Sequence, residues 1–246
     1  MKNYYGSLCT ELYEILHKDA PQEELDFYLS YARAGERILE PLCGSGRFLI
    51  PFLERGYDIQ GMDLSEEMLE KLRRKRPGAP VVRSDMTGYE PEEPFDYIFI
   101  SSGSISLFTD LEVCGRILAK VRAMLKKGGK FVFAAETMAD RCADSEDYEE
   151  TASVWTAAGE TLVLKTRHTY DAASRTQFSP GIYELYRDGE LLQRETMDFQ
   201  THLYKPGEME LMLREAGFTE VQVYASFDKK PVSLDQPEML LYECTC

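Results

Sequence analysis

The chain has 246 residues, of which 43% are hydrophobic and 11% aromatic, and this composition is typical of a globular protein with one core and room for an insertion. Lys and Arg total 28 against 43 Asp and Glu, so the formal net charge is −15. A field of this sign repels a phosphate backbone and an anionic bilayer, which argues against nucleic acid and membrane partners. We expect a single domain over residues 1–246.

The six cysteines form no CxxC pair and no histidine stands at ligand spacing from them. This pattern predicts reduced, packed thiols rather than a disulfide framework or a metal site. The N-terminal stretch lacks the continuous apolar core of a signal peptide, and no run approaches a membrane span. We expect a cytoplasmic protein, and its oligomeric state is left open.

Apolar residues recur at helical spacing near the N-terminus, and Pro21 ends the first pattern, so residues 1–33 are expected to form a helical cap. Strand and helix signals then alternate. The expected strands are 37–40, 58–63, 80–85, 95–101 and 130–136, and the helices between them are 48–56, 65–75 (with Ser65 as N-cap) and 111–129. This alternation is typical of βαβ units, so an α/β fold with a doubly wound, parallel sheet is predicted over residues 34–137.

The alternation ends after about residue 137. Two runs of alternating polarity follow, 161–171 and 181–204, and the second contains Asp188-Gly189 as a hairpin turn. Helical periodicity returns at 207–218, before strands at 219–227 and 238–245. We therefore expect an antiparallel β insert over 138–205, lying over the substrate site between the fifth strand and the last helix. Residues 206–246 supply that helix and the last two strands.

The stretch LEPLCGSGRFLIPF places Gly44 and Gly46 in the first strand-to-helix turn, the usual ligand site of an open α/β sheet. A dinucleotide fingerprint needs a third glycine three residues further on, where this chain has Leu49. Asp63 ends the second strand nineteen residues beyond Gly44. A carboxylate at that place can accept both ribose hydroxyls of a nucleoside.

Two further strand ends agree with this interpretation. Asp85-Met86 follows the third strand and offers an adenine ring one hydrogen-bonding partner and one apolar surface. Small polar residues, Ser101 and Ser102, follow the fourth strand. With these motifs the chain resembles the class I S-adenosylmethionine-dependent methyltransferases, strongly over about residues 35–137 and weakly over the last 40. The resemblance implies a Rossmann-like, mostly parallel seven-stranded sheet.

The resemblance also implies a set of cofactor-binding residues: Glu40, Gly44 and Gly46 for the methionine part of S-adenosylmethionine, Asp63 for the ribose, Leu64, Asp85 and Met86 for the adenine, and Ser101 with Ser102 beside the reacting group. Leu42 stands where the usual loop has glycine, so a less tight first turn is expected, with binding intact. In similar methyltransferases a helical segment folds across the cofactor. Tyr4, Tyr5 and Tyr13 are therefore expected to cover it, and the alternative is a plain amphipathic helix docked on the sheet.

The expected activity is transfer of a methyl group from S-adenosylmethionine to a nucleophilic nitrogen or oxygen of a small molecule. The insert would lie over the methyl group and close the pocket, and the net charge of −15 favours a small molecule over a macromolecule. Two alternatives remain open: a non-catalytic S-adenosylmethionine-binding protein, and a nicotinamide-dependent oxidoreductase. The missing third glycine counts against the oxidoreductase.

Catalytic residues are hard to predict because methyl transfer asks mainly for alignment of the reacting atoms. In a continuous strand over the end of the insert, side chains two apart share a face. Asp198, Gln200, His202 and Tyr204 would fall on one face, and Met197, Phe199, Thr201 and Leu203 on the other. The apolar face should pack on the core, which leaves the polar face towards solvent or towards the methyl group. His202 and Tyr204 are the candidate catalytic residues.

Overall fold

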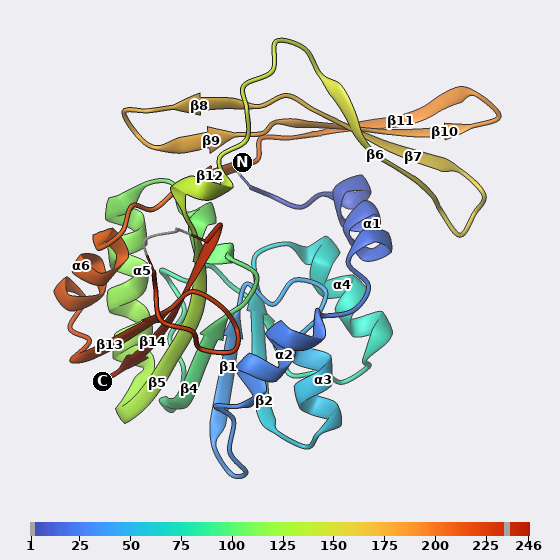
Figure 1. Ribbon diagram of the computed structural model, residues 1–246. Helices are drawn as coiled ribbons and strands as arrows, with labels where there is room; N and C mark the ends of the chain where they lie inside the picture. The colour runs from blue at the N-terminus through green and yellow to red at the C-terminus, as the bar shows by residue number, and fades with distance from the viewer. Residues whose placement is uncertain (1–2, 234–236) are drawn as a thin grey trace.

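The computed structural model describes residues 3–233 and 237–246, so residues 1–2 of the expected cap and 234–236 of the expected C-terminal part lie outside it (Figure 1). The strands of the central sheet are β1 (Arg37–Pro41), β2 (Asp58–Asp63), β3 (Val81–Arg83), β4 (Phe95–Ile100), β5 (Leu125–Glu136), β13 (Glu220–Tyr224) and β14 (Met239–Thr245). Their order is β13-β14-β5-β4-β1-β2-β3, and β14 runs antiparallel to both of its neighbours. The predicted doubly wound, mostly parallel seven-stranded sheet is confirmed.

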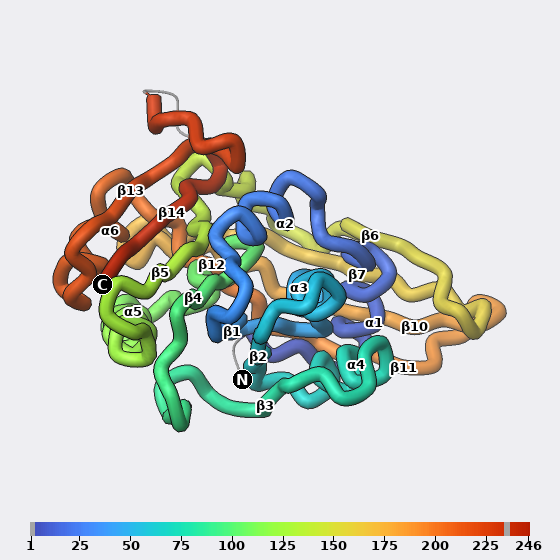
Figure 2. The backbone as a smooth tube through the Cα atoms, turned by 90° about the horizontal axis from the view of Figure 1, so that it is seen from below, coloured from blue at the N-terminus to red at the C-terminus, as the bar shows by residue number. Residues whose placement is uncertain are grey.

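Helices cover both faces of this sheet. One face carries α2 (Gln22–Leu29), α3 (Leu49–Glu54) and α4 (Glu66–Lys75), and the other carries α5 (Leu111–Met124) and α6 (Glu208–Glu215), which lie together in Figure 2. Strand side chains alternate between the faces. Phe131 and Phe133 of β5 therefore pack with α5 and α6, whereas Val132 and Ala134 pack with α2 and α3. Two apolar layers, one on each side of the sheet, make up the core.

The boundary between α5 and β5 differs from the prediction, which extended the helix to residue 129. The helix ends at Met124, and the segment with Gly128 and Gly129 already belongs to the strand. A Cβ atom on Gly129 would lie 3.0 Å from the carbonyl oxygen of Asp96, on the neighbouring strand. The glycines thus allow a close approach of two strands instead of capping a helix. The third strand is also shorter than predicted, because pairing is confined to Val81–Arg83.

The insert between β5 and α6 is antiparallel, as predicted, and forms two small sheets. The first has the order β11-β10-β7-β6 and consists of β6 (Glu149–Trp155), β7 (Thr161–Thr166), β10 (Gly181–Arg187) and β11 (Glu190–Met197). The second has the order β12-β9-β8 and consists of β8 (Thr169–Asp171), β9 (Thr176–Phe178) and β12 (Gln200–His202). The hairpin turn at Asp188-Gly189 is confirmed, because Arg187 pairs with Glu190. Strand β6 was not predicted, since most of its side chains are exposed and its apolar alternation is weak.

The last part of the insert departs from the continuous strand that the sequence suggested. β11 ends at Met197 and β12 begins at Gln200, so the alternation is broken in between. Both faces of β12 are covered, and Gln200, Thr201 and His202 are all buried. Gln200 and His202 therefore do not form a solvent-exposed polar face, which was one of the two expected outcomes. After the break, the short strand pairs with β9 and is buried.

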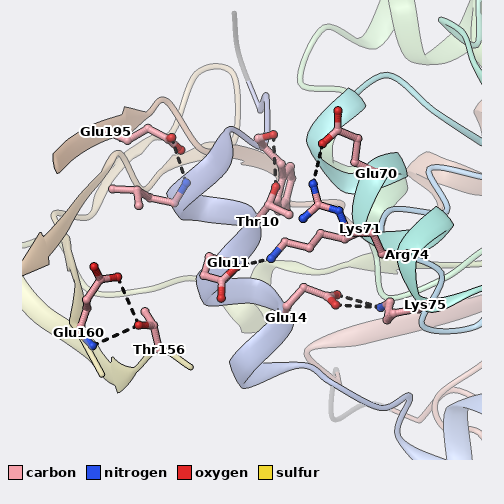
Figure 3. Close-up of polar contacts among 12 residues, drawn as sticks. Thr10, Glu11, Glu14, Glu70, Lys71, Arg74, Lys75, Thr156, Glu160 and Glu195 are labelled. Carbon is pink, nitrogen blue, oxygen red and sulfur yellow. Dashed lines mark hydrogen bonds and ion pairs between the residues drawn. The ribbon is translucent and has the colours of Figure 1, made fainter. Parts of the chain in front are cut away.

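Helix α1 (Ser7–Leu16) lies beneath the four-stranded sheet of the insert and beside α4 (Figure 1). Its apolar side packs on the insert through a small cluster made of Leu8, Cys9 and Leu12 with Leu162, Tyr183 and Met197. Its polar side forms ion pairs with α4, Glu11 with Lys71 and Glu14 with Lys75 (Figure 3). The helix thus connects the insert to the central domain.

Candidate functional site

A cavity of about 430 Å³ lies at the carboxyl ends of β1 and β2, where the first turn meets the N-terminal segment. Six of the residues expected to bind or cover the cofactor line it: Tyr4, Tyr5, Tyr13, Gly44, Asp63 and Leu64. A smaller cavity of about 90 Å³ shares Asp63 and Leu64 with the first, and Asp85 and Met86 line it as well. The side chains that the sequence assigned to ribose and adenine are therefore brought together.

The Asp63 carboxylate organises the first turn. Its Oδ2 atom accepts the backbone N–H of Gly44 at 2.8 Å, and its Oδ1 atom accepts that of Ser65 at 2.9 Å. Burial raises the pKa of Asp63, and these backbone N–H groups partly counter the effect by stabilising the charged form. One carboxylate oxygen thus holds the glycine loop, and the other holds the residue that caps α4.

The two loop glycines have different surroundings. A Cβ atom on Gly44 would meet nothing closer than Met68 Sδ at 3.9 Å, so this backbone is open to the cavity. A Cβ atom on Gly46, which has a φ of +86°, would lie 2.8 Å from Leu72 Cγ. Gly46 lines neither cavity and serves the packing of α4 on the loop. Leu42 has a φ of +58°, so its backbone adopts the left-handed conformation that favours glycine.

A buried acidic group lies behind this turn. Glu40 is 1% exposed, its Oε1 atom accepts the Ser101 hydroxyl at 3.3 Å, and its Oε2 atom has no hydrogen-bond partner among the described residues. Burial raises the pKa of Glu40 well above its usual range, and the hydrogen bond from Ser101 and the charge of Arg47 act against this rise. Neither Glu40 nor Ser101 lines the two cavities.

Sequence reasoning missed two charged residues that join this group. Arg47 Nη2 donates to Ser102 Oγ at 2.5 Å, while its buried Nε atom has no partner within the described residues. Glu24 on α2 accepts the backbone N–H of Ser102 at 2.7 Å. Arg47 follows Gly46 directly, so its place after the glycine loop was the one available signal. Two carboxylates and one guanidinium therefore meet at the ends of β1 and β4, with unused hydrogen-bonding capacity.

These groups fit S-adenosylmethionine chemically. The spare acceptor on Glu40 and the spare donor on Arg47 match the ammonium and the carboxylate of an amino acid. The open backbone at Gly44 and the cavity-lining carboxylate of Asp63 match a sugar, and Met86 offers an apolar wall for a base. No group of three or more His, Cys, Asp or Glu side chains that could hold a metal ion occurs within residues 3–233 and 237–246.

His202 and Tyr204 lie outside this arrangement, and neither lines the two cavities. His202 is fully buried with its Nε2 atom 3.4 Å from Glu208 Oε1, and burial lowers its pKa. The Tyr204 hydroxyl lies 3.4 Å from Cys114 Sγ in the core layer beneath α5. The structure therefore does not bring these two candidate catalytic residues together with the residues expected to bind the cofactor.

Residues 38–129 match a family model described as a methyltransferase domain. A protein of Geobacillus sp. (strain WCH70) that carries the name of a methyltransferase is 25% identical over 237 residues, which cover 89% of this chain and 91% of the relative. This region is therefore a methyltransferase domain, and its fold is that of the S-adenosylmethionine-dependent methyltransferases. The matched region runs from β1 into β5, so it contains the glycine loop and Asp63.

Two solved structures show that the fold of this methyltransferase is shared over nearly the whole chain. The sugar N-methyltransferase KedS8 from Streptoalloteichus sp. ATCC 53650 has a TM-score of 0.76 and 21% identity, and the match covers 100% of this chain and 96% of that one. An S-adenosylmethionine-dependent methyltransferase from Clostridium acetobutylicum ATCC 824 also has a TM-score of 0.76, with 16% identity and coverage of 95% and 96%. In the described residues no helix of this methyltransferase has the length and apolar character needed to cross a membrane.

Proposed function

We propose that this methyltransferase transfers a methyl group from S-adenosylmethionine to a nitrogen or oxygen atom of a small molecule. The observation that carries the proposal is the cavity of about 430 Å³, a size typical of small-ligand sites, which is lined by the first turn and by the N-terminal tyrosines. The net charge of −15 disfavours nucleic acid as the acceptor. The match to a sugar N-methyltransferase includes the insert, which supports a small acceptor as well.

Within this proposal, residues 34–137 bind the cofactor and residues 138–205 cover the acceptor. Glu40 and Arg47 would hold the methionine part, with the Gly44 backbone beside it. Asp63 would accept the ribose hydroxyls. The adenine would lie between Leu64 and Met86, with Asp85 at its edge, and Tyr5 and Tyr13 would cover the cofactor. The lining of the two cavities and the unpartnered atoms of Glu40 and Arg47 support these assignments.

The bound cofactor supplies an activated methyl group on a sulfonium, so the chain's own residues mainly hold and enclose the reactants. Alignment of acceptor, methyl and sulfur can lower the barrier by several kcal/mol, roughly 7 to 11 in well-oriented systems. Tyr5 and Tyr13 pack edge to face at 5.9 Å and exclude water from one wall of the cavity. Burial raises the pKa of Tyr5, so its hydroxyl stays neutral at physiological pH.

The test is calorimetric titration of S-adenosylmethionine into the wild type and into Asp63→Ala. Loss of two hydrogen bonds to a charged acceptor, about 1.5 to 3 kcal/mol each, should weaken binding at least tenfold. Asp58→Ala is the matched control, because Asp58 is exposed at the opposite end of β2. Circular dichroism must show a folded variant, since Asp63 also holds the backbone of Gly44 and Ser65.

Unchanged affinity in folded Asp63→Ala would refute the ribose assignment. A wild type that does not bind S-adenosylmethionine would refute the proposed function itself. Once binding is measured, release of S-adenosylhomocysteine is followed with a panel of small amines, phenols and carboxylates. A wild type that binds the cofactor but methylates only macromolecules would contradict the small-molecule proposal.

A further inference from the structure

The carboxyl end of β5 carries a glutamate that has no part in the sites described so far. The backbone N–H of Glu136 donates to Ser106 Oγ at 2.9 Å, which places the strand end against the 3₁₀ turn η1 (Ser104–Leu107). A Cβ atom on Gly103 would lie 3.5 Å from Glu136 Cγ and 3.6 Å from its Oε1 atom. Ser104 follows Gly103 directly and lines the larger cavity. The Glu136 carboxyl therefore lies just behind this wall of the cavity.

The insert faces the same carboxyl with polar groups. The Thr201 side chain on β12 lies close enough to Glu136 to act against the rise in the pKa of that carboxyl. Thr201 pairs with Gln177 across the β12–β9 ladder, so the two side chains share a face. Gln177 is 3% exposed, and its Oε1 atom has no partner among the described residues. A carboxyl group on β5 and an unpartnered amide oxygen on the insert, both hydrogen-bond acceptors, thus belong to neighbouring elements.

The charges around Glu136 are all of one sign. No lysine or arginine in the described part of the chain forms an ion pair with it, and burial followed by the charge of Asp140 raises the pKa of Glu136 to about 7. The titratable groups that face it are Asp140 and Cys142 after β5 and Tyr5 in the N-terminal segment. The charges of both Asp63 and Glu136 act on the Tyr5 hydroxyl. Tyr5 lines the cavity, whereas Glu136 lines neither cavity, so the Glu136 carboxyl lies behind the wall to which Tyr5 belongs.

An acidic, acceptor-rich space without a cation of its own suits a ligand that brings a positive charge and N–H donors. We propose that Glu136 contacts the acceptor as the general base, and that the acceptor is a small primary or secondary amine bound as its ammonium ion. This inference rests on the proposed function and adds the substrate class. A hydroxyl acceptor fits less well, because an aliphatic alcohol is far too weak an acid to give its proton to a carboxylate.

The reaction then proceeds in two steps. An N–H bond of the ammonium breaks, its electron pair stays on nitrogen, and the proton moves to a Glu136 carboxylate oxygen. The nitrogen lone pair forms a bond to the methyl carbon while the carbon–sulfur bond breaks and its electron pair stays on sulfur, which leaves neutral S-adenosylhomocysteine. The methylated product is again an ammonium ion. Glu136 returns its proton to solvent when the product leaves.

The test compares wild type, Glu136→Gln and the control Glu92→Gln, whose side chain is exposed in the loop before β4. The probes are primary amines and the alcohols with the same carbon skeletons, and release of S-adenosylhomocysteine is measured. We expect turnover with the amines and none with the matching alcohols. Glu136→Gln should lower kcat/KM by at least about a hundredfold, as loss of a general base does, and Glu136→Asp should retain part of the activity. Affinity for S-adenosylmethionine should stay within about twofold in all variants.

The pH profile gives a second readout. The base works as a carboxylate, so kcat/KM of the wild type should rise as the pH passes about 7, the pKa of Glu136. Glu136→Gln should lack this limb. Equal turnover of the paired alcohols, full activity of Glu136→Gln, or cofactor binding without turnover of any amine would overturn the inference. Failure of the wild type to bind S-adenosylmethionine would instead refute the proposed function.

Discussion

The N-terminus of α1 is capped from another part of the chain. Its N-cap residue, Gly6, has no side chain. The Glu195 carboxylate of β11 accepts the backbone N–H groups of Leu8 at 3.1 Å and Cys9 at 3.2 Å instead. The change Glu195→Ala leaves both N–H groups without this acceptor. A helix cap contributes about 0.5 to 2 kcal/mol, and a negative charge at a helix N-terminus adds about 0.3 to 1 kcal/mol. Opening of α1 should therefore become easier by about 1 to 3 kcal/mol.

A change of this size increases the opening constant roughly 5- to 150-fold. Amide hydrogen exchange over residues 7–16 measures it directly, and protection should fall in the order wild type, Glu195→Gln, Glu195→Ala. The glutamine variant ranks between the others because it keeps a carbonyl acceptor and loses the charge. Tyr13 lies on α1 and lines the cavity, so affinity for S-adenosylmethionine should fall in the same order. Addition of the cofactor to the wild type should increase protection of this segment.

The matched control is Glu190→Ala, at the exposed start of the same strand. It should leave exchange in α1 unchanged, whereas a general loosening of the insert would affect both variants alike. If Glu195→Ala exchanges at the wild-type rate over residues 7–16, the capping argument is wrong. If exchange rises but cofactor affinity does not change, the docking of α1 is unrelated to the cavity, and the helix is a plain amphipathic helix on the surface.

Two further predictions concern stability. Gly46→Ala should lower the free energy of unfolding, measured in urea, by about 1 to 3 kcal/mol, because the new Cβ would lie 2.8 Å from Leu72 Cγ at a φ of +86°. Gly44→Ala should lower it less, because a Cβ there meets nothing closer than 3.9 Å. Equal losses in the two variants would contradict the different roles given to the two glycines. The folded pKa of Glu136 is raised from 4.5 to about 7, so its contribution to stability is fully present below pH 4.5 and lost as the pH rises through 7. The Tm of the wild type should therefore decline between pH 5 and pH 8, and the part of this decline that is due to Glu136 should be absent in Glu136→Gln. The same decline in the wild type and in Glu136→Gln would refute this prediction.

Features set by local sequence and by parallel pairing were predictable. Ser65 accepts the backbone N–H of Met68, which confirms it as the N-cap of α4. Parallel pairing of β1 with β2 sets Pro41 beside Met62, so the residues that follow each strand meet at one sheet edge. That is why Gly44 and Asp63 could be expected to lie together from their spacing alone.

Contacts that depend on how distant elements pack were not predictable. Glu24 and Ser102 are 78 residues apart, and no periodicity relates a helix near the N-terminus to the end of the fourth strand. The prediction of a polar and an apolar face at the end of the insert failed for another reason. Alternation predicts the direction of side chains only while strand pairing is continuous. After the break at Met197, Thr201, which was assigned to the apolar face, lies on β12 opposite Gln177 of β9.

The attachment of α1 to α4 also bears on how fast the product of the cofactor can be released. The segment that lines the cavity is held to α4 by the ion pairs of Glu11 with Lys71 and Glu14 with Lys75, all four of them partly exposed to water (Figure 3). If the cavity holds the cofactor as proposed, detachment of the helix opens this side of it to a spent nucleoside. Exposed ion pairs weaken as dissolved ions screen them over a Debye length of about 8 Å at physiological ionic strength. Under this proposal we expect added salt to hasten release of the spent nucleoside and to shorten the residence time of a fresh one.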